Sequence, residues 1–245
     1  MSDSKRTFLM SNDENPPSGQ PLELYHLAHD LRGPLNSVMG FSELLIDGVE
    51  GPLNEYQFAD ITAIYQSAGN LLRLINAIVD LSKLEANLFQ LTKGKVLLSK
   101  AIGNIIDYEY GTDKPDRITL NADLPDDLPT VYGQFDRVEL MVANLVRFGF
   151  KLQTSQISIT TEHDEDTVTV MVHIAGVYIP SDELKQMFEL VATTDKNGRT
   201  HLTKGRVELP LARGLAEAHD GKLWAESNEE SGTMFYLQLP QYPKE

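Results

Sequence analysis

The sequence predicts an α + α/β sandwich class: a helical hairpin that forms a dimeric four-helix bundle, followed by an α+β sandwich with helices on one face of a sheet. Two observations predict the hairpin: two long segments carry apolar residues at steps of three and four, and a short connection containing glycine separates them. A third predicts the sandwich, because alternating apolar and polar runs replace the helical spacing after about Leu91. We therefore expect a tail over residues 1–20, the hairpin over 21–90 and the sandwich over 95–241.

Composition argues against several classes of protein. The chain has a net charge of −15 and no run rich in Lys or Arg, which disfavours nucleic acid or an anionic membrane surface as a partner. It has no cysteine, so disulfides, thiol catalysis and cysteine metal sites are excluded. No stretch approaches the roughly 18 apolar residues of a membrane span, and residues 1–20 lack the apolar centre of a signal peptide. We expect a disordered tail and a cytoplasmic protein that receives its signal from another protein.

The hairpin is predicted from two apolar stripes. The first helix, at about 22–46, has the stripe Leu24, Leu27, Leu31, Leu35 and Val38; the second, at about 57–87, has Ile61, Ile64, Ala68, Leu71, Ile75 and Ile78. Further apolar positions such as Met39, Leu72 and Val79 lie beside these stripes. Two helices alone do not cover so wide an apolar face, so we expect a homodimer in which two hairpins form a four-helix bundle.

The second half alternates helices with strands. We expect helices near 97–108, 136–151 and 209–219, a helix after Pro180, and strands at 118–125, 222–228 and 232–240. Residues 156–174 form two alternating runs around a polar turn and are typical of a β-hairpin.

His29 is the candidate catalytic residue of the first helix. With Leu24 at 0° and about 100° per residue, His29 lies about 140° from the apolar stripe, so its imidazole is expected to face solvent. A neutral imidazole nitrogen can attack phosphorus. Asp30 could orient the ring or take its proton, and Arg32 could balance charge on the phosphoryl oxygens. Pro34 lies inside the predicted helix, where proline destabilises the helix by roughly 3 kcal/mol relative to alanine. An unfavourable residue of this kind persists either for function or because the surrounding structure imposes it.

The string His-Asp-Leu-Arg-Gly-Pro-Leu at 29–35 resembles the H-box of bacterial two-component sensor histidine kinases, and the resemblance continues to Leu-Ser-Lys-Leu-Glu-Ala-Asn at 81–87. The resemblance implies that residues 21–90 are a dimerisation and phosphoacceptor hairpin with His29 as phosphoacceptor. Family members often carry Thr or Asn four residues after the histidine, which is implied to help hydrolyse the partner's phosphoryl group. Gly33 stands there, so phosphatase activity by that route is not expected.

The resemblance covers about Pro21 to Pro240 and implies that residues 95–241 are a histidine-kinase-type ATP-binding domain, but three nucleotide motifs depart from the family pattern. Phe148 stands where an Asn would ligate magnesium, and a phenyl ring offers no oxygen. Ile174 replaces the carboxylate that accepts the adenine amino group, and Tyr178, in place of a glycine, would fill space. Glu208 lies in the stretch matching the glycine-rich turn, where it would repel phosphate, although Gly205 permits a one-residue shift of register. We therefore expect no bound ATP or Mg²⁺, with Mg²⁺ supplied by a partner receiver domain.

Three functions stay open. The first is a phosphorelay histidine phosphotransferase, a degenerate kinase that carries a phosphoryl group on His29 between response-regulator aspartates without binding ATP. The second is an active ATP-dependent sensor histidine kinase with an atypical nucleotide site. The third is a non-catalytic adaptor that binds a response regulator or a kinase. The expected partners are a second copy of the chain, receiver domains of response regulators and a sensor kinase.

Overall fold

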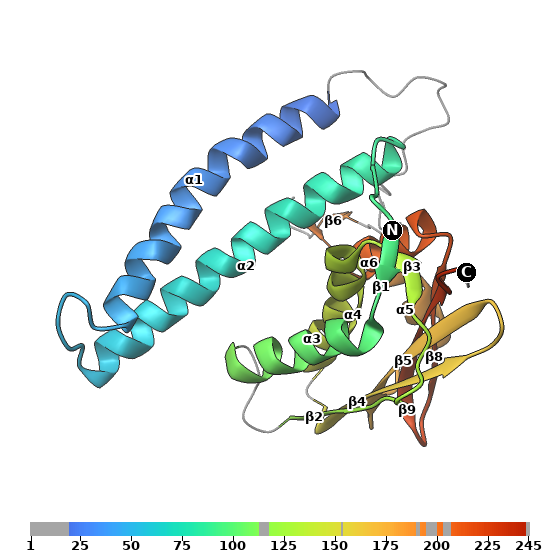
Figure 1. Cartoon of the computed structure of the whole chain (residues 1–245). Helices are drawn as coiled ribbons and strands as arrows, with labels where there is room; N and C mark the ends of the chain where they lie inside the picture. Colours follow the sequence, from blue (N-terminus) through green and yellow to red (C-terminus); the bar gives the residue numbers. More distant parts are fainter. Residues whose placement is uncertain are drawn as a thin grey trace, which may run out of the picture. The chain divides into compact units, whose positions relative to one another are not determined.

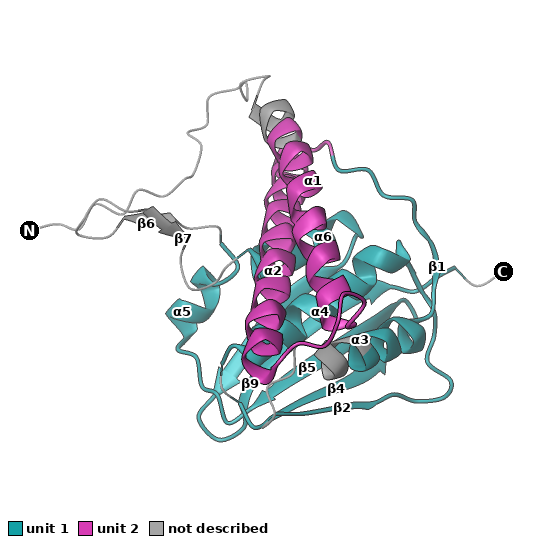
Figure 2. Cartoon of the chain, turned by 90° about the vertical axis from the view of Figure 1, so that its left-hand side faces the viewer, with its two compact units in different colours: residues 1–10, 89–245 teal, residues 11–88 magenta. Residues whose placement is uncertain are grey.

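The computed structural model describes residues 20–112, 118–152, 154–189, 192–194, 200–202 and 207–243, without the side chains of 20–25, 108–112, 192–194 and 200–202. These residues divide into two units, one ending at Leu88 and the other beginning at Phe89 (Figure 2). Within the described part of the chain, no helix has both the length and the apolar character needed to cross a bilayer.

The first unit is a hairpin of two long helices, α1 (Gln20–Ile46) and α2 (Glu55–Glu85) (Figure 1). Gly48 and Gly51 adopt positive φ angles of 71° and 115° in the connection, a backbone region that glycine enters without steric cost. Helix α2 begins with a capping box: Asn54 Oδ1 accepts from the Gln57 N–H, and Gln57 Oε1 accepts from the Asn54 N–H. Because each side chain pairs an otherwise free amide, the helix starts two residues before the predicted Gln57.

Of the predicted α1 stripe residues whose side chains the structure describes, only Leu35 lies on the face that α1 turns towards α2. The face that packs on α2 carries Ala28, Arg32, Leu35, Met39, Ser42 and Ile46, of which Ala28 and Ser42 are buried. The predicted stripe residues Leu27, Leu31 and Val38 are exposed in the single chain, as are Ile64 and Leu71 of α2. Small and polar side chains therefore occupy much of the α1–α2 contact, and most of the α1 stripe that was predicted for a dimeric four-helix bundle is exposed in the single chain.

The second unit contains a five-stranded sheet in the order β2-β4-β5-β9-β8. The strands are β2 (Thr119–Asp123), β4 (Gln156–His163), β5 (Thr167–Ala175), β8 (Lys222–Asn228) and β9 (Gly232–Pro240). β2 is parallel to β4, and the other neighbours are antiparallel. Helices α3 (Leu98–Thr112), α4 (Phe135–Phe150) and α6 (Glu208–Ala218) cover one face (Figure 1). Alternate residues of β5 and β9 are buried, so their apolar side chains form the core beneath these helices. This arrangement confirms the predicted fold class.

Several short elements were not predicted from the sequence. β1 (Gly94–Val96) pairs with β3 (Val131–Gly133), and β6 (Ala192–Thr194) pairs with β7 (Thr200–Leu202). Strands of three residues are too short to display an alternating pattern, so their pairing depends on tertiary contacts. The short helix α5 (Ser181–Gln186) follows Pro180 as expected.

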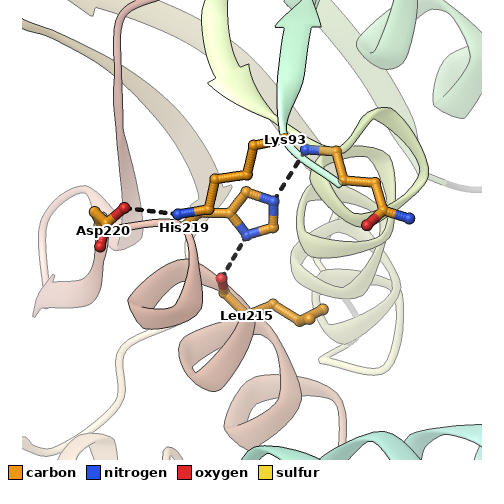
Figure 3. Close-up of polar contacts among 5 residues, drawn as sticks. Lys93, Leu215, His219 and Asp220 are labelled. Atoms are coloured by element: carbon orange, nitrogen blue, oxygen red, sulfur yellow. Dashed lines mark hydrogen bonds and ion pairs between the residues drawn. The ribbon is translucent and has the colours of Figure 1, made fainter. Parts of the chain in front are cut away.

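His219, just after α6, joins two elements of the second unit (Figure 3). The imidazole is fully buried; Nδ1–H donates to the Leu215 carbonyl at 2.7 Å, and Nε2 accepts from the Gln134 N–H at 3.2 Å. Gln134 is the N-cap of α4 and makes no side-chain cap bond there. Beside His219, Lys93 Nζ forms an ion pair with Asp220 Oδ2 at 2.6 Å. A neutral imidazole thus links the end of α6 to the start of α4.

Candidate functional site

His29 projects into solvent from α1, as the helical spacing predicted. Its side chain is 73% exposed, and its Nδ1 lies 3.5 Å from Asp30 Oδ1, the long limit of a hydrogen bond. Asp30 is itself 81% exposed and therefore holds the ring only loosely. With Nδ1 turned towards the carboxylate, Nε2 is the ring nitrogen left open to an incoming group.

The backbone around His29 follows from Gly33 and Pro34. Pro34 has no N–H to donate to the Asp30 carbonyl, yet α1 continues through it. One turn later, Ser37 Oγ donates to the Gly33 carbonyl at 3.1 Å. A Cβ on Gly33 would meet no atom within 4 Å, so the surface next to His29 is open.

Arg32 is bound to α2. Its Nε and Nη2 both donate to Asn76 Oδ1, at 3.0 Å and 2.8 Å, and the side chain is half-buried. Arg32 was predicted to balance charge on the phosphoryl oxygens. Only the guanidinium N–H groups that do not bind Asn76 are left for that role. Asn76 was missed at the sequence level because it lies 44 residues away, and no local pattern links the two positions.

Phe148 and Ile174, the positions matched to magnesium and adenine recognition, lie in the core of the second unit. Both side chains are fully buried. The Phe148 ring packs edge-on against the Phe235 ring, with centroids 5.6 Å apart. Ile174 Cδ1 lies close to the position that a Cβ on Gly149 would take. Neither side chain offers a polar atom to a metal ion or a base, so these two positions do not fit the ligand roles of the family motifs.

Tyr178 is the residue that was expected to fill space needed by a nucleotide. It lies half-exposed in the loop between β5 and α5. Two side chains of the sheet hold this loop: Thr233 Oγ1 donates to the Val177 carbonyl at 2.7 Å, and Ser227 Oγ accepts from the Ile179 N–H at 2.9 Å. The backbone on both sides of Tyr178 is therefore fixed to the sheet.

The polar groups near the start of α6 are Asn144, Lys151 and Glu208. Asn144 Nδ2 donates to the Glu208 backbone carbonyl at 3.4 Å, and Lys151 Nζ pairs with Glu208 Oε1. These are the groups through which a nucleotide or a cation could be held here. The described residues contain no cluster of three or more His, Cys, Asp or Glu side chains arranged for a metal ion. Of the stretch at 204–209 that was matched to the glycine-rich turn, residues 204–206 lie outside the described part of the chain.

Comparison with known protein families finds two matches. Residues 22–87 match the His Kinase A (phospho-acceptor) domain, and residues 133–243 match the histidine kinase-, DNA gyrase B- and HSP90-like ATPase.

Curated relatives include histidine protein kinase DivJ of Caulobacter vibrioides, 27% identical over 91% of this chain and 38% of DivJ. They also include cell-division control histidine kinase PdhS of Brucella abortus, 25% identical over 89% of this chain and 22% of PdhS. The chain therefore spans well under half the length of either relative.

Two solved structures share the fold. Full-length ShkA in complex with AMPPNP has a TM-score of 0.67 and 21% identity over 91% of this chain and 46% of ShkA. Histidine kinase ThkA in complex with response regulator protein TrrA has a TM-score of 0.57 and 22% identity over 92% of this chain and 63% of ThkA.

These findings contradict the expectation that ATP and Mg²⁺ are not bound. The second unit matches a family of ATPases, and the ShkA structure was solved with an ATP analogue in place. That expectation was wrong because it judged nucleotide binding from a few side chains. Phosphates are also held by backbone N–H groups, which a change of side chain does not remove.

Proposed function

The chain belongs to the two-component histidine kinase family, and we propose that it carries a phosphoryl group on His29 which it exchanges with the aspartate of a response-regulator receiver domain. The observation that carries this proposal is the exposed His29 imidazole, whose Nδ1 faces Asp30 while Nε2 stays open. The complex of ThkA with TrrA supports a response regulator as the partner.

The transfer is a displacement at phosphorus. The Nε2 lone pair attacks the phosphorus of the receiver's aspartyl phosphate, a P–N bond forms, and the P–O bond to the carboxylate breaks with its electrons leaving on that oxygen. Asp30 favours the tautomer with its proton on Nδ1 and stabilises the positive charge that develops on the ring. The reverse sequence returns the phosphoryl group to an aspartate.

Arg32 acts mainly as a positioning residue in this proposal. Its two hydrogen bonds to Asn76 fix α1 against α2 one turn from His29. The remaining guanidinium donors are available to phosphoryl oxygens, because an arginine has five N–H donors and Asn76 takes two. Arg32 is therefore also proposed to balance the negative charge on the phosphoryl oxygens.

The acting form in this proposal is a homodimer. Leu27, Leu31, Val38 and Phe41 form an exposed apolar stripe on α1, and Ile64 and Leu71 are exposed on α2. An apolar surface of this kind on a long hairpin favours association with a second hairpin. Dimerisation on this stripe leaves His29 uncovered, because His29 lies on a different side of α1.

A second candidate is loading of His29 from ATP within the same protein. The match to an ATPase family and the ShkA complex favour it. Both candidates use His29 as the carrier and differ in the donor.

The test supplies two donors separately. The purified protein is incubated with [γ-³²P]ATP, or with receiver domains loaded from [³²P]acetyl phosphate, and acid-labile label is followed on the wild type and on the His29→Gln variant. Label on the wild type alone supports the carrier, and the donor that gives it separates the two candidates. Label that persists in His29→Gln assigns the carrier to another residue, and no label from either donor favours an adaptor. Either result overturns the proposal.

A further inference from the structure

The Glu208 carboxylate is only partly hydrogen-bonded at the first residue of α6. Its side chain is 18% exposed, Oε1 pairs with Lys151 Nζ, and Oε2 is buried without a hydrogen-bond partner in the described part of the chain. A buried charged oxygen with no partner is destabilising. An unsatisfied group of this kind therefore points to a role other than stabilisation.

The start of α6 attracts negative charge. The N–H groups of Glu208 and Leu209 have no carbonyl within the helix to bond, and the N-cap Val207 provides no side-chain bond to them. Pro210 has no N–H, and the Leu211 N–H already donates to the Val207 carbonyl at 3.0 Å. The positive end of the helix dipole lies at the same place. Glu208 therefore brings the chain's own anion to a helix end that would otherwise favour an external one.

Lys151 brings a cation to the same place from the end of α4. It is the C-cap residue of this helix, and its N–H donates to the Phe148 carbonyl at 3.1 Å. Asn144 of α4 holds the other partner of the pair, because its Nδ2 donates to the Glu208 carbonyl at 3.4 Å. An ammonium group with three N–H donors is suited to phosphate oxygens. Paired with a carboxylate, it attracts them less, because the two charges cancel at a distance.

We propose that the Lys151–Glu208 ion pair competes with the phosphates of ATP, so that nucleotide binds only when the pair opens and Lys151 is released. The inference rests on the second candidate under the proposed function, in which the second unit binds ATP, and it adds the residues that set the affinity. The pair lies within residues 133–243, which match an ATPase family. Glu208 then lowers the affinity for ATP without abolishing it, and Lys151 is the group that it withholds.

The affinity test compares two variants that lose one negative charge from the same helix. Glu208→Gln breaks the pair, and Glu217→Gln changes an exposed carboxylate that pairs with Arg213 at 3.0 Å. Calorimetric titration of the full chain with ATP and Mg²⁺ measures each Kd. Glu208→Gln should bind ATP about tenfold more tightly than the wild type, because repulsion of the phosphates is removed and Lys151 is released. Glu217→Gln should keep the wild-type Kd.

A double-mutant cycle with Lys151→Met separates the release of Lys151 from simple repulsion. In the Lys151→Met background, Glu208→Gln should tighten ATP binding by less than about threefold, because no cation is left to be released. The two positions should also be coupled in thermal unfolding of the protein without nucleotide, since either single change leaves a charged partner unpaired. This second readout does not depend on ATP.

Wild-type or weaker ATP binding by Glu208→Gln, or an equal gain with and without Lys151, would overturn the inference. Undetectable binding of ATP by every variant would overturn it as well. Transfer of label from [³²P]phosphoryl receiver domains to His29 is measured on the same proteins and tests the proposed function separately. Label on His29 without ATP binding leaves the carrier in place, whereas tighter ATP binding by Glu208→Gln without label on His29 from either donor removes only the carrier.

Discussion

Protonation of His219 should destabilise the second unit. In its neutral form, Nδ1–H donates to the Leu215 carbonyl and Nε2 accepts from the Gln134 N–H. A proton on Nε2 would place two N–H donors against each other across 3.2 Å. The start of α4 would then lose the acceptor that pairs its N-cap amide.

Burial is the main cause that lowers the pKa of His219 below its ordinary value of 6.5. The positive charges of Lys93 and Arg137 lower this pKa further, whereas the hydrogen bond to Leu215 and the charge of Asp220 raise it. Because the native pKa lies below that of the unfolded chain, the unfolded state binds more protons as the pH falls through 6.5. The contribution of neutral His219 to the free energy of unfolding is therefore complete above pH 6.5 and is lost as the pH falls towards the pKa of His219 in the native state.

The magnitude follows from linkage for one group. The free energy of unfolding should fall by up to about 1.4 kcal/mol per pH unit below about pH 6.5 and level off below the native pKa. Urea unfolding from about pH 5 to about pH 7.5, followed by the fluorescence of Trp224, the only tryptophan of the chain, measures this slope. His219→Gln should reduce the slope, and the matched change at the exposed His163 should not. Equal slopes in the wild type and His219→Gln would refute this reasoning.

Three further outcomes are expected. Asn76→Ala should lower the free energy of unfolding of the hairpin by about 1–3 kcal/mol, because it leaves Arg32 without its acceptor. A double-mutant cycle with Arg32→Ala, measured by thermal unfolding, tests this, and the absence of coupling between the two positions would contradict it. Phe148→Ala should lower the free energy of unfolding measured in urea by about 3–5 kcal/mol, because the ring is fully buried. Tyr178→Ala should lower it by less than about 1 kcal/mol, because this side chain is half-exposed. Similar losses for the two variants would argue against the core position of Phe148. Leu71→Glu should convert the dimer into a monomer in light scattering after size exclusion, and a variant that stays dimeric would place the copy–copy interface elsewhere.

Local patterns in the sequence determined most of the larger elements. Apolar periodicity predicted both long helices, alternation predicted the hairpin of β4 and β5 and the two final strands, and the angle from the apolar stripe predicted that His29 is exposed. These features depend on residues within one or two turns of each other, so the sequence alone contains the information.

Tertiary contacts decided the rest. Whether Leu31 or Met39 faces α2 depends on how two helices pack, and both positions satisfy the same helical spacing. The bond of Arg32 to Asn76 and that of His219 to Gln134 join residues 44 and 85 positions apart. Such pairs arise only when folding brings distant segments together, because the hydrogen-bonding capacity of a side chain does not specify its partner.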